Sequence, residues 1–415
     1  MREMKDSEIE WIRVIPKTWK ISKIKYHLKR NEPRNPGDKT VLSLYREYGV
    51  IPKDSRDDNH NVTSEDTSKY KYVRVGDFVV NKMKAWQGSV AVSEYEGIVS
   101  PAYFIYNFND NTFYRKYFHY LLRSCYKDEF RRLSGGIREG QWDLPAEGLN
   151  NTLVVIPPIN EQKQISDYLD NKCSEIDSLT ADIQKQIEIL EEYKRSVITE
   201  AVTKGIDDNV EMKDSGVQWI GFIPKHWEVN KGKYILQYIQ KPTKETDGII
   251  TCFRDGEVTL RSNRREEGFT IADKEIGYQG IDVGDLVVHG MDGFAGAIGI
   301  SDSRGKASPV LNVLDTKQVK KYIMYYLRSM AYNDVFIALA TGIRVRSCDL
   351  RWNKLAELLY PLPPIDEQQA IVEHIDSVLE RTDDIISEKK QQIETLEEYK
   401  KSLIFEYVTG KKEVY

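Results

Sequence analysis

The chain carries Pro-Pro-Ile-Asn-Glu-Gln at residues 157–162, and nearly the same stretch, Pro-Pro-Ile-Asp-Glu-Gln, returns at residues 363–368. A proline cannot continue a helix that comes from upstream, and an Asn or Asp followed by Glu is typical of a helix N-terminus. Each stretch therefore predicts the start of a long helix. We expect the first helix to end near Gly205 and the second near Gly410, because glycine commonly terminates helices.

Downstream of both stretches, apolar residues recur at every seventh position. A seven-residue repeat held over four or more heptads indicates a supercoiled pair of helices. In the simpler alternative, each helix packs only on its own globular part. Two equivalent helices in one chain favour an intramolecular antiparallel coiled coil instead. Its seam is predicted to contain Leu169, Ile176, Ile183, Leu190, Val197, Ile371, Val378, Ile385 and Tyr399.

The segments before the helices are also repeated. Met-Lys-Asp-Ser at residues 4–7 returns at 212–215, and the Ile-Pro-Lys-x-Trp motif that ends at Trp19 returns with Trp227. These shared tryptophans suit core packing or domain docking. The pattern predicts an α+β protein made by tandem duplication of a unit of about 200 residues, which is far longer than a solenoid repeat. The expected parts are globular segments 1–158 and 206–362, helices 159–205 and 363–410, and a tail, 411–415.

Composition excludes several classes of protein. The 415 residues are 40% hydrophobic and 30% charged, which is typical of a globular chain, and no apolar run is long enough to span a membrane. The four cysteines form no CxxC pair and the six histidines are isolated, so no metal site is predicted. There is no phosphate-binding loop or dinucleotide motif, and no catalytic residue could be identified. We expect a cytoplasmic protein that is not an enzyme.

Charge is unevenly distributed along the chain. The net charge of -5 disfavours a nucleic-acid partner when it is taken alone. However, residues 20–155 contain 22 Lys and Arg against 17 Asp and Glu, whereas residues 160–200 contain 5 against 10. The second copy repeats this contrast. Mildly basic globular parts joined by acidic helices suit two heads that approach a polyanion and a spacer that avoids it.

The order of motifs resembles the specificity subunit of type I restriction–modification systems. The Ile-Pro-x-x-Trp, Gly-Asp-Phe/Leu-Val-Val, Ser-Pro and Pro-Pro-Ile-x-Glu-Gln elements, and helices ending in Val-Thr-Lys-Gly or Val-Thr-Gly, occur in order twice. The resemblance covers essentially the whole chain. It implies two target recognition domains, each reading one half of a bipartite site in double-stranded DNA, with the helices acting as a ruler between them.

The resemblance also implies partners. Two modification (methyltransferase) subunits would dock on the chain and bring S-adenosylmethionine, and restriction subunits would bring ATP- and Mg-dependent translocation and cleavage. This chain itself would hold no cofactor. Helices of about 40 residues are roughly 60 Å long, enough to hold two heads about one DNA turn or more apart.

Base reading requires Arg, Lys, Asn or Gln side chains presented to base edges, together with phosphate contacts that fix the register. Candidates lie in polar or glycine-flanked stretches of both heads, although each could be an ordinary solvated side chain. The candidates are Lys82, Lys84, Trp86, Gln87, Arg131, Arg132, Arg138 and Gln141 in the first head, and Arg254, Arg261, Arg264, Arg265, Arg344, Arg346 and Arg351 in the second.

Two other functions compete with DNA recognition. A coiled-coil scaffold whose heads bind protein would show no sequence-dependent DNA binding in its assembled complex. A nuclease with an unrecognised site would cleave DNA by itself in a metal-dependent reaction, but the sequence groups no carboxylates with a basic partner. The basic heads and the glycine-flanked arginines favour DNA recognition.

Overall fold

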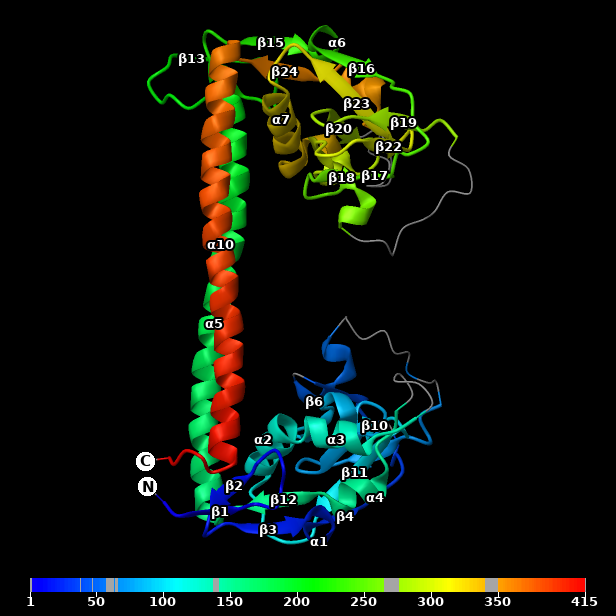
Figure 1. Ribbon diagram of the computed structural model, residues 1–415, viewed down its shortest axis with the longest axis vertical. Coiled ribbons are helices and arrows are strands. Elements are labelled where there is room, and N and C mark those ends of the chain that lie inside the picture. Colours follow the sequence, from blue (N-terminus) through cyan, green and yellow to red (C-terminus); the bar gives the residue numbers. More distant parts are fainter. Residues whose placement is uncertain are drawn as a thin grey trace. The chain divides into compact units, whose positions relative to one another are not determined.

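The computed structural model describes residues 2–37, 39–46, 48–56, 63, 66–136, 142–264, 276–339 and 350–414 (Figure 1). The chain divides into two compact units. Unit 1 comprises residues 1–183 and 391–415, and unit 2 comprises residues 184–390. Each unit therefore contains one head together with parts of both long helices, and the units are described separately below.

The head of unit 1 is built on a four-stranded antiparallel sheet in the order β4-β11-β8-β9, with further two-stranded pairs around it. Its central strand β8 is buried along its whole length, as the run Phe-Val-Val-Asn predicts for an inner strand. The strands are β1 (Met4–Asp6), β2 (Val14–Pro16), β3 (Lys20–Lys23), β4 (Leu28–Arg30), β5 (Leu42–Tyr45), β6 (Gly49–Pro52), β7 (Lys71–Val73), β8 (Phe78–Asn81), β9 (Val90–Val92), β10 (Gly97–Val99), β11 (Tyr103–Phe108) and β12 (Leu153–Ile156). The helices are α1 (Ile24–His27), α2 (Arg115–Cys125), α3 (Lys127–Leu133) and α4 (Ala146–Asn151).

The head of unit 2 repeats this fold. Its four-stranded sheet has the equivalent order β16-β23-β20-β21, and each two-stranded pair has a counterpart in unit 1. The strands are β13 (Met212–Asp214), β14 (Phe222–Pro224), β15 (Glu228–Lys231), β16 (Leu236–Ile239), β17 (Ile250–Cys252), β18 (Val258–Leu260), β19 (Gln279–Ile281), β20 (Leu286–His289), β21 (Ile298–Ile300), β22 (Gly305–Ala307), β23 (Leu311–Thr316) and β24 (Leu359–Leu362). The helices are α6 (Gly232–Ile235), α7 (Lys320–Tyr332), α8 (Val335–Ala338) and α9 (Trp352–Leu355). The duplication seen in the sequence is thus a duplication of fold.

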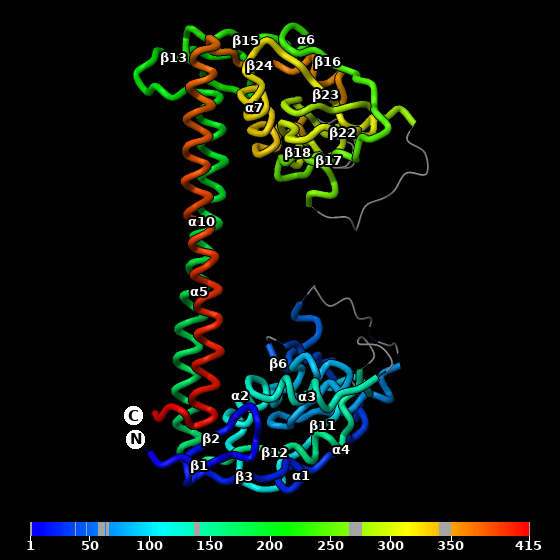
Figure 2. The backbone as a smooth tube through the Cα atoms, viewed as in Figure 1, coloured from blue at the N-terminus to red at the C-terminus, as the bar shows by residue number. Residues whose placement is uncertain are grey.

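The two long helices are α5 (Ile159–Lys204) and α10 (Ile365–Val408), and they lie side by side in opposite directions (Figure 2). In unit 1, Lys400 Nζ donates to Asp177 Oδ1 at 2.6 Å. In unit 2, Lys194 Nζ donates to Asp383 Oδ1 at 2.5 Å. In the repeat, Asp177 corresponds to Asp383 and Lys194 corresponds to Lys400. Each unit therefore contains one copy of the same ion pair, with the aspartate on α5 in unit 1 and on α10 in unit 2. The predicted α+β fold and antiparallel coiled coil are confirmed.

The predicted seam needs one correction, in the second helix. Leu169, Ile176, Ile183 and Ile371 are buried, but Ile385 is 43% exposed and Tyr399 is 53% exposed, so neither belongs to the seam. The row equivalent to Leu169 runs through Ile375, Thr382, Lys389, Leu396 and Leu403, of which Ile375, Thr382 and Leu403 are buried. Two polar members in that row made a neighbouring, more apolar row look like the seam.

The repeated Glu and Gln at the start of each helix attach it to its head. Trp19 and Trp227 are fully buried, and their indole N–H groups donate to Glu161 and Glu367 at 2.9 Å. Gln162 is also fully buried, accepts the N–H of Tyr114 at 2.7 Å, and donates to Thr112 O and Pro157 O. Gln368 makes the equivalent bonds to Val319 N–H and Pro363 O. The predicted packing role of the tryptophans therefore holds.

The glycine that follows each long helix completes this attachment. Gly205 and Gly410 have φ of 81° and 72°, which favours glycine. A Cβ on Gly410 would lie 2.6 Å from Pro16 Cδ and 2.8 Å from Trp19 Cη2, and one on Gly205 would lie 3.3 Å from Trp227 Cζ2. Each glycine thus lets a helix end close against the buried tryptophan of a head.

Candidate nucleic-acid interface

In the first head, the loop between β8 and β9 (residues 82–89) carries four of the predicted DNA-binding residues. Asn81 ends β8 and its Oδ1 accepts the N–H of Met83 at 3.2 Å. A short 3₁₀ helix follows (Ala85–Gln87), and Gly88 closes it with φ of 91° and an N–H bond to Ala85 O of 2.7 Å. Ala85 is buried, whereas Lys84 is exposed. The loop therefore has a fixed backbone and outward-facing polar side chains.

This loop borders a cavity of about 410 Å³ in the first head. Asn81, Met83, Lys84, Trp86 and Gln87 belong to its lining. The lining also includes Leu42 and Ser43 of β5, Lys53 and Thr63, and Tyr70 and Tyr103. Aromatic rings beside amide and ammonium groups form a surface that can contact both the face and the edge of a nucleobase.

The segment after residues 137–141 packs on the same loop. Lys82 Nζ donates to Asp143 Oδ2 at 2.7 Å, and the Trp86 and Trp142 rings pack edge to face with centroids 5.5 Å apart. The backbone N–H of Leu144 donates to Lys82 O at 2.9 Å. The structure thus brings Lys82, Lys84, Trp86 and Gln87 together in one loop. Arg138 and Gln141 lie outside the described residues.

The second head has the same loop backbone between β20 and β21 (residues 290–297). His289 Nδ1 accepts the N–H of Met291 at 3.2 Å, at the position where Asn81 acts in the first head. A 3₁₀ helix (Gly293–Ala295) again ends at a left-handed glycine, Gly296, with φ of 95°. The side chains differ: Lys82, Lys84, Trp86 and Gln87 are replaced by Gly290, Asp292, Phe294 and Ala295.

The β17–β18 hairpin of the second head carries or contacts two predicted arginines, and one of them, Arg254, lies beside this loop. Arg254, at the hairpin tip, is 66% exposed, and its Nη2 donates to Asp292 Oδ1 at 2.9 Å. Arg264 pairs with Asp255 and Glu257, and its guanidinium lies 4.2 Å from the centre of the Phe253 ring. Arg261 begins a short 3₁₀ helix after β18.

The remaining candidates fall in different places. Arg132 makes a two-pronged pair with the buried Glu129 at 2.7 and 2.8 Å, and Arg131 precedes it in α3, which packs against the 3₁₀ helix of the β8–β9 loop. Arg351 directly precedes α9. Arg265, Arg344 and Arg346 lie outside the described residues.

Sequence reasoning missed three residues of these surfaces: Asn81, Arg46 and Asp292. Arg46 is exposed on the β5–β6 hairpin of the first head, at the position of Arg254 in the second. Asp292 is acidic, and a carboxylate is not expected at a surface that faces a polyanion. Lining up the two copies position by position would have found all three, because the loops and hairpins match at a constant shift.

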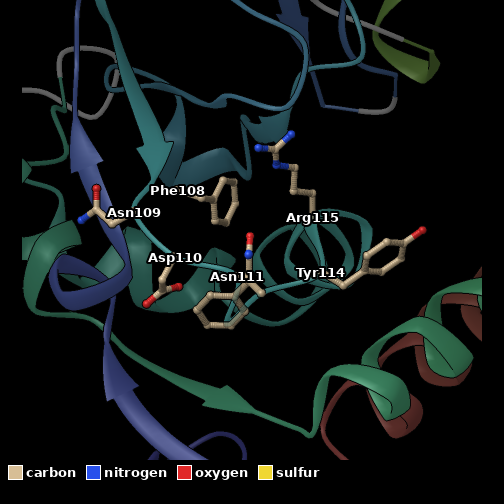
Figure 3. A pocket seen from close by; sticks show the side chains of 7 residues that line it. Phe108, Asn109, Asp110, Asn111, Tyr114 and Arg115 are labelled. Carbon is tan, nitrogen blue, oxygen red and sulfur yellow. The ribbon is translucent and has the colours of Figure 1, made fainter.

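A second hollow in the first head, of about 360 Å³, lies at the turn from β11 to α2 (Figure 3). Asp110 and Arg115 both line it but point away from one another (Figure 3). Asp110 Oδ2 instead lies 3.0 Å from His27 Nδ1. The hollow lies at the turn that presents the Tyr114 N–H to Gln162, and Asp110 Oδ1 accepts the N–H of Thr112 at 3.0 Å within that turn.

Within the part of the chain that the structure describes, no group of His, Cys, Asp and Glu is arranged to hold a metal ion. Among the same residues, no helix has the length and apolar character needed to cross a bilayer.

Comparison with known proteins gives consistent results. Residues 16–189 and 274–395 match the family model described as the type I restriction modification DNA specificity domain, which is more than two-thirds of the chain. A putative type I restriction enzyme MjaX specificity subunit from Methanocaldococcus jannaschii is 25% identical over 370 residues, covering 85% of this chain and 81% of that protein. The type I restriction enzyme EcoBI specificity subunit of Escherichia coli is 24% identical over 271 residues, covering 58% of this chain and 54% of that protein.

Two solved structures share the fold. A chain from a type I R-M system, studied for its complex assembly and conformational transition, superposes with a TM-score of 0.69 at 12% identity, covering 96% of this chain and 99% of that one. The HsdS subunit from Thermoanaerobacter tengcongensis gives a TM-score of 0.51 at 13% identity, covering 96% of this chain and 98% of that one.

Proposed function

This chain belongs to the type I restriction–modification DNA specificity family, and from that premise we propose that each of its heads reads one half of a bipartite, gapped target in double-stranded DNA. Its role is DNA recognition rather than catalysis. The two halves of the target differ in sequence, because the heads present different side chains. The bases between the halves are free to vary, but their number is fixed by helices α5 and α10.

One observation carries this proposal: the two heads share their anchoring residues and the backbone of the loop after β8 or β20, but the side chains exposed on that loop differ. The tryptophan, Glu and Gln that anchor each head are present in both copies. The loop that follows β8 or β20 keeps its 3₁₀ turn and its left-handed glycine while its exposed side chains change. A duplicated frame with divergent loops is what two readers of different DNA sequences require.

The long helices carry a second repeated surface. Tyr193 and Tyr399 are exposed at equivalent positions, and so are Leu179 and Ile385. Because Asp177 pairs with Lys400, Leu179 and Tyr399 lie at the same level of the helix pair in unit 1. Tyr193 and Ile385 do so in unit 2, where Lys194 pairs with Asp383. Exposed apolar residues that occur twice suit two copies of one partner.

We propose that these partners are two modification subunits, and that restriction subunits join the same complex. In this arrangement S-adenosylmethionine serves the modification subunits, and ATP and Mg²⁺ serve the restriction subunits. The acidic helices hold the partners, while the basic heads approach the DNA. The net charge of -5 predicts weak binding of DNA by the chain alone, so recognition is expected in the assembled complex.

The test is to co-express the chain with a modification subunit of its family and to map methylated adenine across the host genome by single-molecule sequencing. One asymmetric, gapped motif that disappears when the chain is omitted is the expected result. Replacing residues 1–158 with the head of another family member should then change one half of the motif only. A complex that assembles but methylates no gapped motif would contradict the proposal.

A further inference from the structure

We infer that Arg254, held in place by Asp292, reads a guanine in the half-site of the second head; this inference rests on the proposed function and names one base contact within it. Arg254 is two-thirds exposed at the tip of the β17–β18 hairpin. Among the described residues, Asp292 is the polar partner of its guanidinium, through the Nη2–Oδ1 bond of 2.9 Å. A guanidinium has five N–H donors, so this bond leaves donors to spare.

The backbone of Asp292 is itself held within the β20–β21 loop. His289 Nδ1 accepts the backbone N–H of Asp292 at 3.0 Å, in addition to that of Met291. The loop also packs directly on the hairpin, since a Cβ on Gly296 would lie 2.6 Å from the carbonyl oxygen of Arg254. Only glycine fits there without moving the hairpin tip. The loop that carries Asp292 and the hairpin tip that carries Arg254 are thus in direct backbone contact.

The chemistry of this pair points to guanine. Guanine presents two acceptors, O6 and N7, to the major groove, and the parallel N–H donors of an arginine match them. Fixing the guanidinium beforehand removes the rotamer entropy that a free arginine loses on binding. A carboxylate bonded to one edge leaves the opposite edge to face the base. Arg264, which follows the 3₁₀ helix after β18, is paired with two carboxylates of the hairpin and lies over Phe253, so its guanidinium is already used within the head.

The first head has no equivalent of the Arg254–Asp292 pair. Arg46 lies at the position of Arg254, but Lys84 stands where the second head has Asp292. A lysine cannot hold an arginine, and the like charges repel. The arginine–carboxylate contact is therefore a property of the second half-site, and the first half-site is read by other groups of the β8–β9 loop.

The experiment uses the full complex and adenine-methylation mapping, with Arg254→Gln as the main variant. Gln prefers adenine, so one guanine of the second half-site should relax or change to adenine, with methylation of the original motif falling about 5- to 150-fold. The first half-site and the gap should stay unchanged. Asp292→Asn should weaken discrimination at that same base, and Asp292→Glu should restore part of it. Lys225→Gln is the matched control: it replaces an exposed cation of the same head that also pairs with a carboxylate, Glu211, and it should leave the motif intact.

The outcomes separate this inference from the proposed function. A normal gapped motif that keeps its guanine in the Arg254→Gln complex overturns the inference and leaves the proposed function standing. Asp292→Asn that alters the first half-site, or no position at all, also overturns it. If Arg254→Gln abolishes methylation altogether, the Asp292→Asn complex becomes the test. The inference then stands if that complex relaxes one guanine of the second half-site, and it is overturned if no guanine there is relaxed. If the wild-type complex yields no gapped motif, both proposals fail.

Discussion

His119 shows how one side chain makes the first head sensitive to acid. It lies in α2, where its Nδ1 accepts the N–H of Val92 at 3.2 Å and Arg123 lies 3.1 Å from its Nε2. Burial, with a smaller contribution from the Arg123 charge, lowers the pKa of His119 from 6.5 to about 4. The folded head therefore holds the neutral imidazole over a pH range in which the unfolded chain binds a proton.

The stability of the first head should therefore fall as the pH drops from 6.5 to 4. The lowered pKa corresponds to a loss of at most about 3 kcal/mol over that range. His119→Gln, which can still accept the Val92 N–H, should flatten this dependence. Hydrogen exchange of α2 and β9 peptides at several pH values measures it. The second head has Met324 at this position and serves as the internal control. An unchanged pH slope in the variant would contradict the assignment.

Gly410 is a residue at which both backbone and packing require glycine. Gly410→Ala places a methyl group against Pro16 and Trp19 in addition to forcing alanine to a φ of 72°. We expect a loss of about 2 kcal/mol or more in the stability of unit 1, since the left-handed conformation alone costs alanine about 1–2 kcal/mol. Gly216→Ala is the control, because Gly216 has a similar φ of 71° but open space around it. Thermal unfolding of the two variants measures the difference, and equal losses would mean that packing is unimportant.

At the scale of elements, each head is joined to its helices by a few buried polar groups. Gln162→Leu should remove the acceptor for the Tyr114 N–H in a fully buried site. Leaving a buried donor unsatisfied costs about 1–3 kcal/mol. Gln164→Leu is the matched control, because Gln164 is an exposed residue of the same helix.

Denaturant unfolding, or hydrogen exchange at the α2 N-terminus, measures the effect of Gln162→Leu. The exchange increase should be confined to the first head. If both glutamine variants behave alike, Gln162 is not an anchor.

The helix pair also shows which features the sequence predicts well. Repeated motifs and proline-led helix starts predicted α5, α10 and the duplicated heads, because those signals are local and strong. The seam of α10 was partly misplaced, since Thr382 and Lys389 interrupt its true row, and a seven-residue count alone follows the most apolar stripe. Matching α10 to α5 through the internal repeat would have identified the correct row of α10, because the two helices correspond position by position.

The candidate interface was predictable to a lesser degree. Two lysines, a tryptophan and a glutamine ahead of Gly88 pointed to the loop after β8, and the structure places Lys82, Lys84, Trp86 and Gln87 together on that loop. The contact between Arg254 and Asp292 joins a hairpin tip to a loop 38 residues away, and nothing local in the sequence signals that pairing. Long-range partners of this kind require the fold.

For the whole molecule, the ruler role of the helices gives a quantitative prediction. Inserting seven residues between 185 and 186, and seven between 391 and 392, should lengthen both helices by about 10.5 Å while keeping the heptad register. At about 3.4 Å per base pair, the gap in the methylated motif should grow by about three base pairs. Both half-sites should stay the same. Methylation mapping of the variant complex measures the gap, and an unchanged gap would contradict the ruler.

The repeated exposed residues of the helices predict the stoichiometry of the complex. Tyr193→Ser combined with Ile385→Ser should remove one of the two partner surfaces, and Leu179→Ser with Tyr399→Ser the other. Each double variant should bind one modification subunit instead of two, as native mass spectrometry can count. The quadruple variant should bind none. Full binding by the quadruple variant would place the partner surface elsewhere.

The internal repeat has a consequence for inheritance. Leu-Glu-Glu-Tyr-Lys occurs at residues 190–194 and again at 396–400, so a crossover between these two positions would keep the helix sequence continuous. A crossover between them deletes one head and leaves a single head followed by one long helix. Lys194 and Lys400 occupy the same position of the repeat, and so do Asp177 and Asp383. In two copies of the shortened chain, the lysine of each helix could therefore pair with Asp177 of the other. The offspring would then recognise a palindrome, so that a single genetic event turns an asymmetric target into a symmetric one.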